Sequence, residues 1–161
     1  MRTVRIGQDL LEQIERQAAG DYPDETCGFL FSGAEEAYAT TRAVRSIEPV
    51  PNSFDGERRR RFVISPMELR VAEERAAGRS EVVSGFYHSH PDHPAVPSAF
   101  DAEHAWPWYT YLVVSVGARG PQGVGAFELE ADRPRFRPCK LDVHPGAFVR
   151  VEEPAAARAG R

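Results

Sequence analysis

Two histidines, a serine and an aspartate fall within one short stretch of this sequence. His88 and His90 flank Ser89, and Ser98 and Asp101 follow in the pattern H-S-H-x7-S-x-x-D. Two neutral imidazoles and a carboxylate are a common ligand set for a hydrolytic Zn²⁺, which keeps its fourth position for water and lowers the pKa of that water. We therefore predict that His88, His90 and Asp101 bind one zinc ion per chain and that the protein catalyses a hydrolysis.

The segments around these residues are expected to bring them together. Residues 82–87 form an apolar run that predicts a buried strand, and side chains two apart on a strand share a face. His88 and His90 would thus point the same way, with Ser89 on the other face. Three prolines between positions 91 and 97 predict a loop. Ser98 then suits the N-cap of a helix whose first turn contains Asp101, so a strand end and a helix start would converge on one ion.

Each feature taken alone has an ordinary structural explanation. A surface histidine pair often binds nothing, and a serine three residues before an aspartate at a helix start is a common capping arrangement. The four residue types at this spacing are expected by chance in on the order of 10⁻³ of chains of this length. The combination therefore favours the metal site.

The pattern H-S-H-P-x6-S-x-x-D resembles the signature of the JAMM/MPN+ metalloprotease family. That signature includes an upstream glutamate, and residues 22–30, YPDETCGFL, are similar to the family segment P-x-E-x-C-G-x-L. The glutamate at the matching position is Glu25. The similarity continues through Asn52, the FVISP segment at 62–66 and the GFY segment at 85–87, and covers roughly residues 5–140.

The resemblance implies the mechanism of a zinc metallopeptidase. His88, His90 and Asp101 would hold Zn²⁺, and Glu25 would take a proton from the attacking water and return it to the leaving amine. Ser98 would donate a hydrogen bond to the oxyanion of the tetrahedral intermediate. From its local sequence alone, Glu25 is better explained as a solvated carboxylate at a helix end. The family pattern reverses that preference.

The resemblance also implies a class of substrate. Family members cleave the amide bond after the C-terminal glycine of ubiquitin-like proteins, and small stand-alone prokaryotic members act on sulfur-carrier proteins. Because this chain is short, we expect it to release a sulfur-carrier protein with a Gly-Gly end from an attached amino acid or lysine side chain. The tail would lie along a strand edge, in a narrow channel that residues 51–61 help to shape. A homodimer is compatible with this scheme.

Two other functions fit the same residues. In a binding scaffold of the metal-free MPN kind, these side chains would be inert. A zinc hydrolase of small peptides would use the same metal chemistry with a different pocket. The complete set favours an enzyme over a scaffold: Glu25, His88, His90, Ser98 and Asp101.

Length and composition predict one domain. The 161 residues are 42% hydrophobic and 27% charged, which is ordinary for a globular protein. The formal charge of −4 argues against general nucleic-acid binding, and four arginines at 58–61 are expected to form a solvated loop. We expect a catalytic domain at 1–145 and a partly disordered extension at 146–161. With no apolar leader, no long apolar run and no cysteine framework, the sequence predicts a cytoplasmic protein that does not enter membranes.

Hydrophobic periodicity predicts a mixed α/β fold, with a β-sheet flanked by helices. The expected strands are 2–6, 27–32, 62–64, 82–88, 109–116, 123–130 and 135–139, and the expected helices are 8–19, 66–78 and one after Ser98. Residues 37–44 are expected to form a hairpin with 27–32, and residues 46–61 a polar connection. The family resemblance implies that these elements build a cytidine-deaminase-like JAB/MPN core.

The two cysteines and two further histidines are not expected to bind the metal. Cys27 is expected to be a buried filler beside Glu25, and a fourth zinc ligand is the less favoured alternative. Cys139 supports no functional inference. His93 and His104 stay outside the metal set because exposure is the default for polar side chains.

Overall fold

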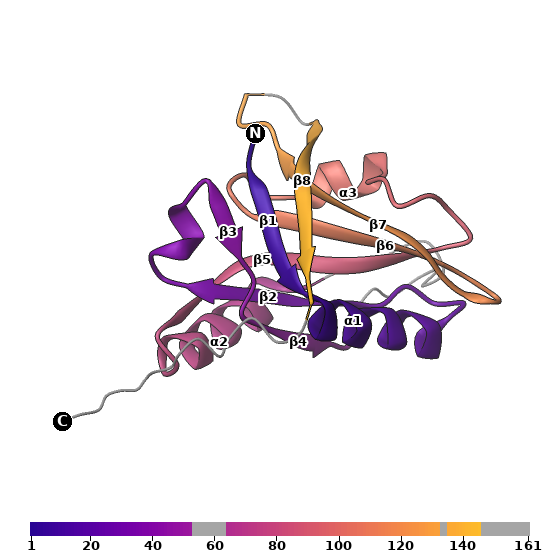
Figure 1. Cartoon of the computed structure of the whole chain (residues 1–161), viewed down its shortest axis with the longest axis horizontal. Coiled ribbons are helices and arrows are strands. Elements are labelled where there is room, and N and C mark those ends of the chain that lie inside the picture. The colour runs from indigo at the N-terminus through magenta and orange to yellow at the C-terminus, as the bar shows by residue number, and fades with distance from the viewer. Residues whose placement is uncertain (53–63, 133–134, 146–161) are drawn as a thin grey trace.

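An eight-stranded mixed sheet with three α-helices forms the protein in the computed structural model, which describes residues 1–52, 64–132 and 135–145 (Figure 1). The strands are β1 (Thr3–Gly7), β2 (Cys27–Gly33), β3 (Thr41–Ala43), β4 (Ser46–Val50), β5 (Glu81–Pro91), β6 (Thr110–Gly117), β7 (Gly120–Leu129) and β8 (Phe136–His144). The helices are α1 (Gln8–Asp21), α2 (Pro66–Ala77) and α3 (Ala99–His104), with a short 3-10 helix, η1 (Glu36–Tyr38). The mixed α/β class expected from the sequence is confirmed.

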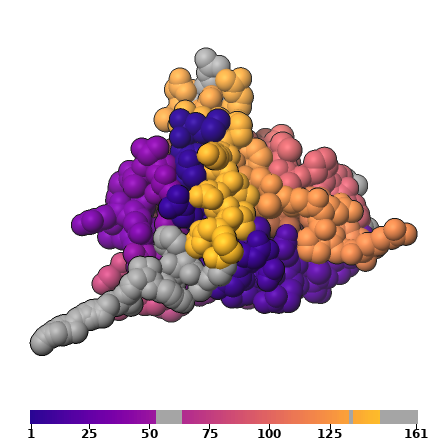
Figure 2. All heavy atoms as spheres, in the orientation of Figure 1, coloured from indigo at the N-terminus to yellow at the C-terminus, as the bar shows by residue number. Residues whose placement is uncertain are grey.

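The strand order in the sheet is β3-β1-β8-β7-β6-β5-β2-β4. The pairs β1–β3, β1–β8 and β5–β6 are parallel, and the other neighbours are antiparallel. The first and last strands therefore lie side by side, as the indigo and yellow segments of Figure 2 show. This pairing places both ends of the described chain on the half of the sheet away from β5.

Two hydrophobic cores lie on opposite faces of the sheet. Alternation along a strand separates them: Leu30 of β2 belongs to the core under α1, whereas Phe29 and Phe31 belong to the core under α2. Helix α1 contributes Leu11, Ile14 and Ala18 to the first core, and α2 contributes Ala72 and Ala76 to the second. Each helix thus buries one apolar face against the sheet.

Strand β5 lies at the centre of the functional half of the sheet. Every residue from Val83 to Pro91 is buried, and the strand pairs with β2 on one side and β6 on the other. Phe86, in the core under α2, alternates in step with His88 and His90, so all three project from the same face. The strand extends past the predicted end at 88, and both histidines therefore belong to it.

A buried arginine connects the edge strand β3 with β5, in the other half of the sheet. Arg42 is fully buried, its Nε donates to Ala37 O at 2.8 Å, and its Nη1 lies 3.0 Å from Ser84 O and 2.8 Å from Trp108 O. The guanidinium also stacks over the Trp108 ring at 4.4 Å. Burial lowers the pKa of Arg42 to about 10, so the group keeps its charge at neutral pH. These contacts connect the edge strand to β5 and to the loop before β6.

Part of the predicted topology was wrong. The segment expected to be a hairpin partner of 27–32 contains η1 and β3, and β3 pairs in parallel with β1. The antiparallel partner of β2 at this edge is β4, which lies within the expected polar connection 46–61. Ile64 is not in a strand. The rest of the predicted 62–64 strand, the arginines at 58–61 and the extension at 146–161 lie outside the described residues.

No described helix has the length and apolar character needed to cross a membrane.

The close approach of β5 to β6 depends on the absence of a side chain at Gly85. A Cβ at this position would lie 2.2 Å from Thr110 O, a backbone atom that cannot rotate away. We expect Gly85→Ala to lower the free energy of unfolding by about 3 kcal/mol or more, measured by urea unfolding. Gly123→Ala in β7 is the matched control, because nothing lies within 4 Å of its added Cβ. An equal effect of both substitutions would contradict this account of the β5–β6 contact.

Candidate metal centre

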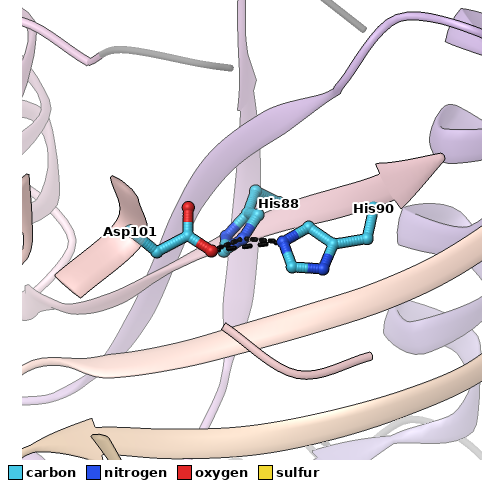
Figure 3. A group of neighbouring side chains, drawn as sticks. All are labelled: His88, His90 and Asp101. Carbon is cyan, nitrogen blue, oxygen red and sulfur yellow. Dashed lines mark hydrogen bonds and ion pairs between the residues drawn. The ribbon is translucent and has the colours of Figure 1, made fainter. Parts of the chain in front are cut away.

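Three buried side chains bring their ligand atoms to one point. His88 Nε2 and His90 Nε2 lie 3.2 Å apart, and each lies 3.1 Å from Asp101 Oδ2. The exposed fractions of the residues His88, His90 and Asp101 are 1%, 6% and 8%. Figure 3 shows the two imidazoles of β5 and the carboxylate of α3 converging from separate elements. The structure thus brings together the three residues predicted as ligands.

The spacing of these atoms fits a tetrahedral zinc ion. With ligands about 2.0 Å from the ion, the donor atoms of a tetrahedral site lie about 3.3 Å apart. The observed separations of 3.1–3.2 Å are close to that value. Two imidazole nitrogens and one carboxylate oxygen also have the chemistry that zinc prefers in hydrolytic sites. The three residues therefore suit the ion without rearrangement.

The ligands are oriented by hydrogen bonds behind them. His90 Nδ1 lies 2.9 Å from Pro94 O, which can only accept, so Nδ1 carries a hydrogen, and in the neutral imidazole Nε2 then has the lone pair that a metal ion requires. Asp101 belongs to a capping box at the start of α3. Ser98 N donates to Asp101 Oδ2 at 2.7 Å, and Asp101 N donates to Ser98 Oγ at 3.1 Å. The proline-rich loop and the helix cap thus fix the direction of both side chains.

Electrostatics keep the carboxylate ionised. Burial by itself would raise the pKa of Asp101, but the charge of His88 and hydrogen bonds from both histidines and the Ser98 amide outweigh it and hold the pKa well below its usual range. Burial by itself would lower the pKa of His90. Its hydrogen bonds to Asp101 and to Pro94 O outweigh that effect, so the pKa of His90 is raised. The surroundings of His90 thus favour positive charge at this site.

Glu25 lies beside the centre in the loop between α1 and β2. The residue is 6% exposed and lines the same cavity of 500 Å³ as His90 and Ser98. Asn52 Nδ2 donates to Glu25 O at 3.3 Å, which ties the loop to the chain after β4. The structure therefore brings Glu25 to the metal centre, although 63 positions in the sequence separate it from the first histidine.

A second cavity also borders the centre. It has a volume of 460 Å³ and contains His88 and Asp101 in its wall. The rest of the wall is largely aromatic, with Phe86, Phe100, Trp106 and Tyr111. The Tyr111 hydroxyl accepts a hydrogen bond from Trp106 N at 2.7 Å and so holds the loop that carries this tryptophan. His88 and Asp101 thus border an aromatic-lined cavity, whereas His90 borders the cavity that contains Glu25 and Ser98.

The other candidate ligands lie outside the cluster. Cys27 is fully buried and donates to Val50 O at 3.5 Å, and burial raises the pKa of its thiol to about 12. Among the described residues it is not part of the three-ligand group. His93 lines the cavity with Glu25, and His104 lines the aromatic cavity. No pattern in the sequence indicates the role of Pro94 O, because a backbone acceptor has no side-chain signature.

The family follows from comparison with known proteins. Residues 7–130 match the family described as prokaryotic homologs of the JAB domain. The chain belongs to this family. It is also 39% identical over 111 residues to a desampylase of Haloferax volcanii, a match that covers 68% of this chain and 76% of that protein. With the metal-binding group of His88, His90 and Asp101, the chain is a metallopeptidase of the JAMM type.

Solved structures agree with the JAB/MPN fold. A protein of Salinibacter ruber is 34% identical with a TM-score of 0.65, and the match covers 99% of this chain and 97% of the other. A protein of Desulfitobacterium hafniense matches with a TM-score of 0.76 at 24% identity, covering 90% and 95% of the two chains. A JAB1/MPN domain protein of Archaeoglobus fulgidus has a TM-score of 0.55 at 18% identity, with coverage of 87% and 98%. The last two show the fold alone.

Metal binding should depend on pH because zinc and the proton compete for His90. Its raised pKa makes this competition begin at a higher pH than for an ordinary imidazole. Below that pKa, the affinity for zinc should fall about tenfold per pH unit for the one proton displaced. Titrating the metal-free protein with zinc at several pH values measures this dependence of the affinity. The range is about pH 5 to pH 8, in which histidine side chains change their charge. An affinity independent of pH over that range would contradict the assignment of His90 as a ligand.

Proposed function

We propose that this protein is a zinc-dependent peptidase that hydrolyses the amide bond after the C-terminal glycine of a ubiquitin-like or sulfur-carrier protein. The observation that carries the proposal is the convergence of three ligand atoms beside one cavity that also contains Glu25 and Ser98. The similarity to a desampylase supports this class of substrate. Zinc, when bound by His88, His90 and Asp101, would polarise the scissile carbonyl and lower the pKa of a water molecule.

Glu25 is the proposed general base and acid. Its carboxylate shares a cavity with His90, and its negative charge contributes to the raised pKa of that imidazole, so the two groups are close. In this position the carboxylate accepts a proton from the attacking water and delivers it to the leaving nitrogen. Burial limits competing solvent water around the carboxylate, since only 6% of the residue is exposed.

Ser98 is the proposed oxyanion donor. Its Oγ accepts the hydrogen bond from Asp101 N that caps α3, which occupies one lone pair of the hydroxyl. The hydroxyl hydrogen is not used by that bond and can be donated to the substrate oxyanion. One serine thereby orients the ligand Asp101 and binds the developing charge.

The two cavities separate the halves of the substrate. Glu25 must reach the leaving nitrogen, so the leaving group occupies the cavity that Glu25 lines. The acyl carbon carries the oxyanion and so lies beside Ser98 and the metal ligands, and the chain on its acyl side would extend toward the aromatic cavity, which His88 and Asp101 border. A Gly-Gly tail would enter on that side, because glycine allows the scissile carbonyl to approach the buried ligands closely.

Glu25→Gln separates an enzyme from a scaffold. We expect kcat/KM to fall by about 10²–10⁴-fold with zinc retained, because the amide keeps the shape of the side chain and cannot accept the proton. The substrate is a ubiquitin-like protein joined through Gly-Gly to a C-terminal reporter, with zinc content measured on the same samples. Asp24→Asn, at the exposed neighbouring carboxylate, is the matched control.

Unchanged cleavage by Glu25→Gln would contradict the role of Glu25. Cleavage of small peptides without cleavage of Gly-Gly-tailed proteins would instead select the small-peptide hydrolase. Absence of cleavage in the wild type, with zinc bound, would select the binding scaffold.

A further inference from the structure

The proposed base occupies an irregular segment, whereas the ligands occupy regular elements. Glu25 lies between the end of α1 at Asp21 and the start of β2 at Cys27. Catalysis by a general base requires hydrogen-bond distance to the transferred proton, and small displacements of such a group are costly. The contacts of this short segment therefore decide where the carboxylate lies relative to the metal ligands.

A reciprocal pair of hydrogen bonds joins this segment to the ligand strand. Thr26 N donates to Ser89 Oγ at 2.8 Å, and Ser89 N donates to Thr26 O at 3.0 Å. Thr26 is 2% exposed and Ser89 is fully buried. In an ordinary antiparallel pair, two residues exchange bonds through their main-chain groups alone. Here the serine hydroxyl takes the place of a main-chain carbonyl.

The use of a side-chain acceptor in place of a main-chain carbonyl affects the path of the chain. The β2–β5 ladder pairs Cys27 with His88, so Thr26 and Ser89 continue the same register by one residue. Because the last bond runs through a side chain, the chain can leave the sheet plane directly before Thr26, at Glu25. Glu25 is then the sequence neighbour of Thr26, and the two histidine ligands are the sequence neighbours of Ser89.

Two further bonds hold the same segment. The Tyr22 hydroxyl donates to the carboxylate of Asp92, with 2.9 Å to either oxygen, and Asp92 follows the last residue of β5. Asn52 Nδ2 donates to Glu25 O. The segment is thus tied to the ligand-bearing end of β5 at both its start and its end.

We propose that Ser89 is a positioning residue that sets the distance between Glu25 and the metal ligands through its hydroxyl bond to Thr26 N. The inference rests on the proposed function, because it assigns Glu25 the role of base. Ser89 projects from the face of β5 opposite to His88 and His90, so it does not bind the metal itself.

The experiment compares Ser89→Ala, Ser89→Thr and the control Ser84→Ala. Ser84 is also a buried serine of β5 whose hydroxyl contacts β2, through Ser32 Oγ at 2.7 Å, but it lies five positions before Ser89 and outside both cavities at the metal centre. Zinc content, kcat and KM on the Gly-Gly-tailed reporter, and amide hydrogen exchange of Thr26 by NMR are measured on each protein. The NMR spectrum also establishes that each variant is folded.

Ser89→Ala is expected to keep its zinc, to accelerate exchange of the Thr26 amide at least about tenfold, and to lower kcat by about 10–100-fold with little change in KM. Ser89→Thr keeps the hydroxyl and should restore both exchange protection and kcat. Ser84→Ala should leave both near wild-type values. This pattern distinguishes positioning from a general loss of stability.

Wild-type kcat in Ser89→Ala, or a loss of activity that only follows a loss of zinc, would overturn the positioning role. Unchanged protection of the Thr26 amide in that variant would overturn it as well. If the wild type cleaves no tailed protein, the proposed function fails, and the exchange rates alone then decide whether Ser89 fixes this segment.

Discussion

One carboxylate oxygen, Oδ2 of Asp101, joins the two elements on which the site depends. It accepts a hydrogen bond from Ser98 N at 2.7 Å and lies 3.1 Å from the Nε2 atoms of His88 and His90. The first contact caps α3, and the other two reach the end of β5. Helix α3 has only six residues, too few to be stable without such contacts. The same atom that would bind zinc therefore also fixes where the helix begins.

Burial explains why these groups need a cation. An ionised carboxylate and two imidazoles, all less than 10% exposed, cost free energy unless charge and hydrogen bonds compensate them. Without zinc, the raised pKa of His90 provides part of that compensation by favouring a proton at this site. A divalent ion would replace the proton and satisfy all three donor atoms at once. Metal binding and the local stability of the β5–α3 junction are thus coupled.

The sequence predicted the chemistry of the site better than the arrangement of the sheet. The pattern around His88 and Asp101 is local, and side-chain alternation together with helix capping determines its geometry. The partner of β2 depends on contacts between distant segments, and the prediction of a hairpin at 37–44 was wrong. Arg42 lies in that segment and binds acceptors more than 40 positions away, at Ser84 and Trp108, which no periodicity could indicate. The Ser89–Thr26 bond was missed for the same reason, since 63 positions separate the two residues.

The central claim is that two imidazoles and one carboxylate of this chain hold a zinc ion. X-ray absorption at the zinc edge of the loaded protein tests it most directly, because the method reports the type and distance of the ligand atoms. We predict four nitrogen or oxygen neighbours about 2.0 Å from zinc, with the multiple-scattering pattern of two imidazoles. Loss of that pattern in His88→Ala would confirm the assignment. Absence of that pattern from the loaded wild type would contradict it, as would sulfur neighbours at about 2.3 Å, supplied by Cys27 or Cys139, in place of the imidazole nitrogens.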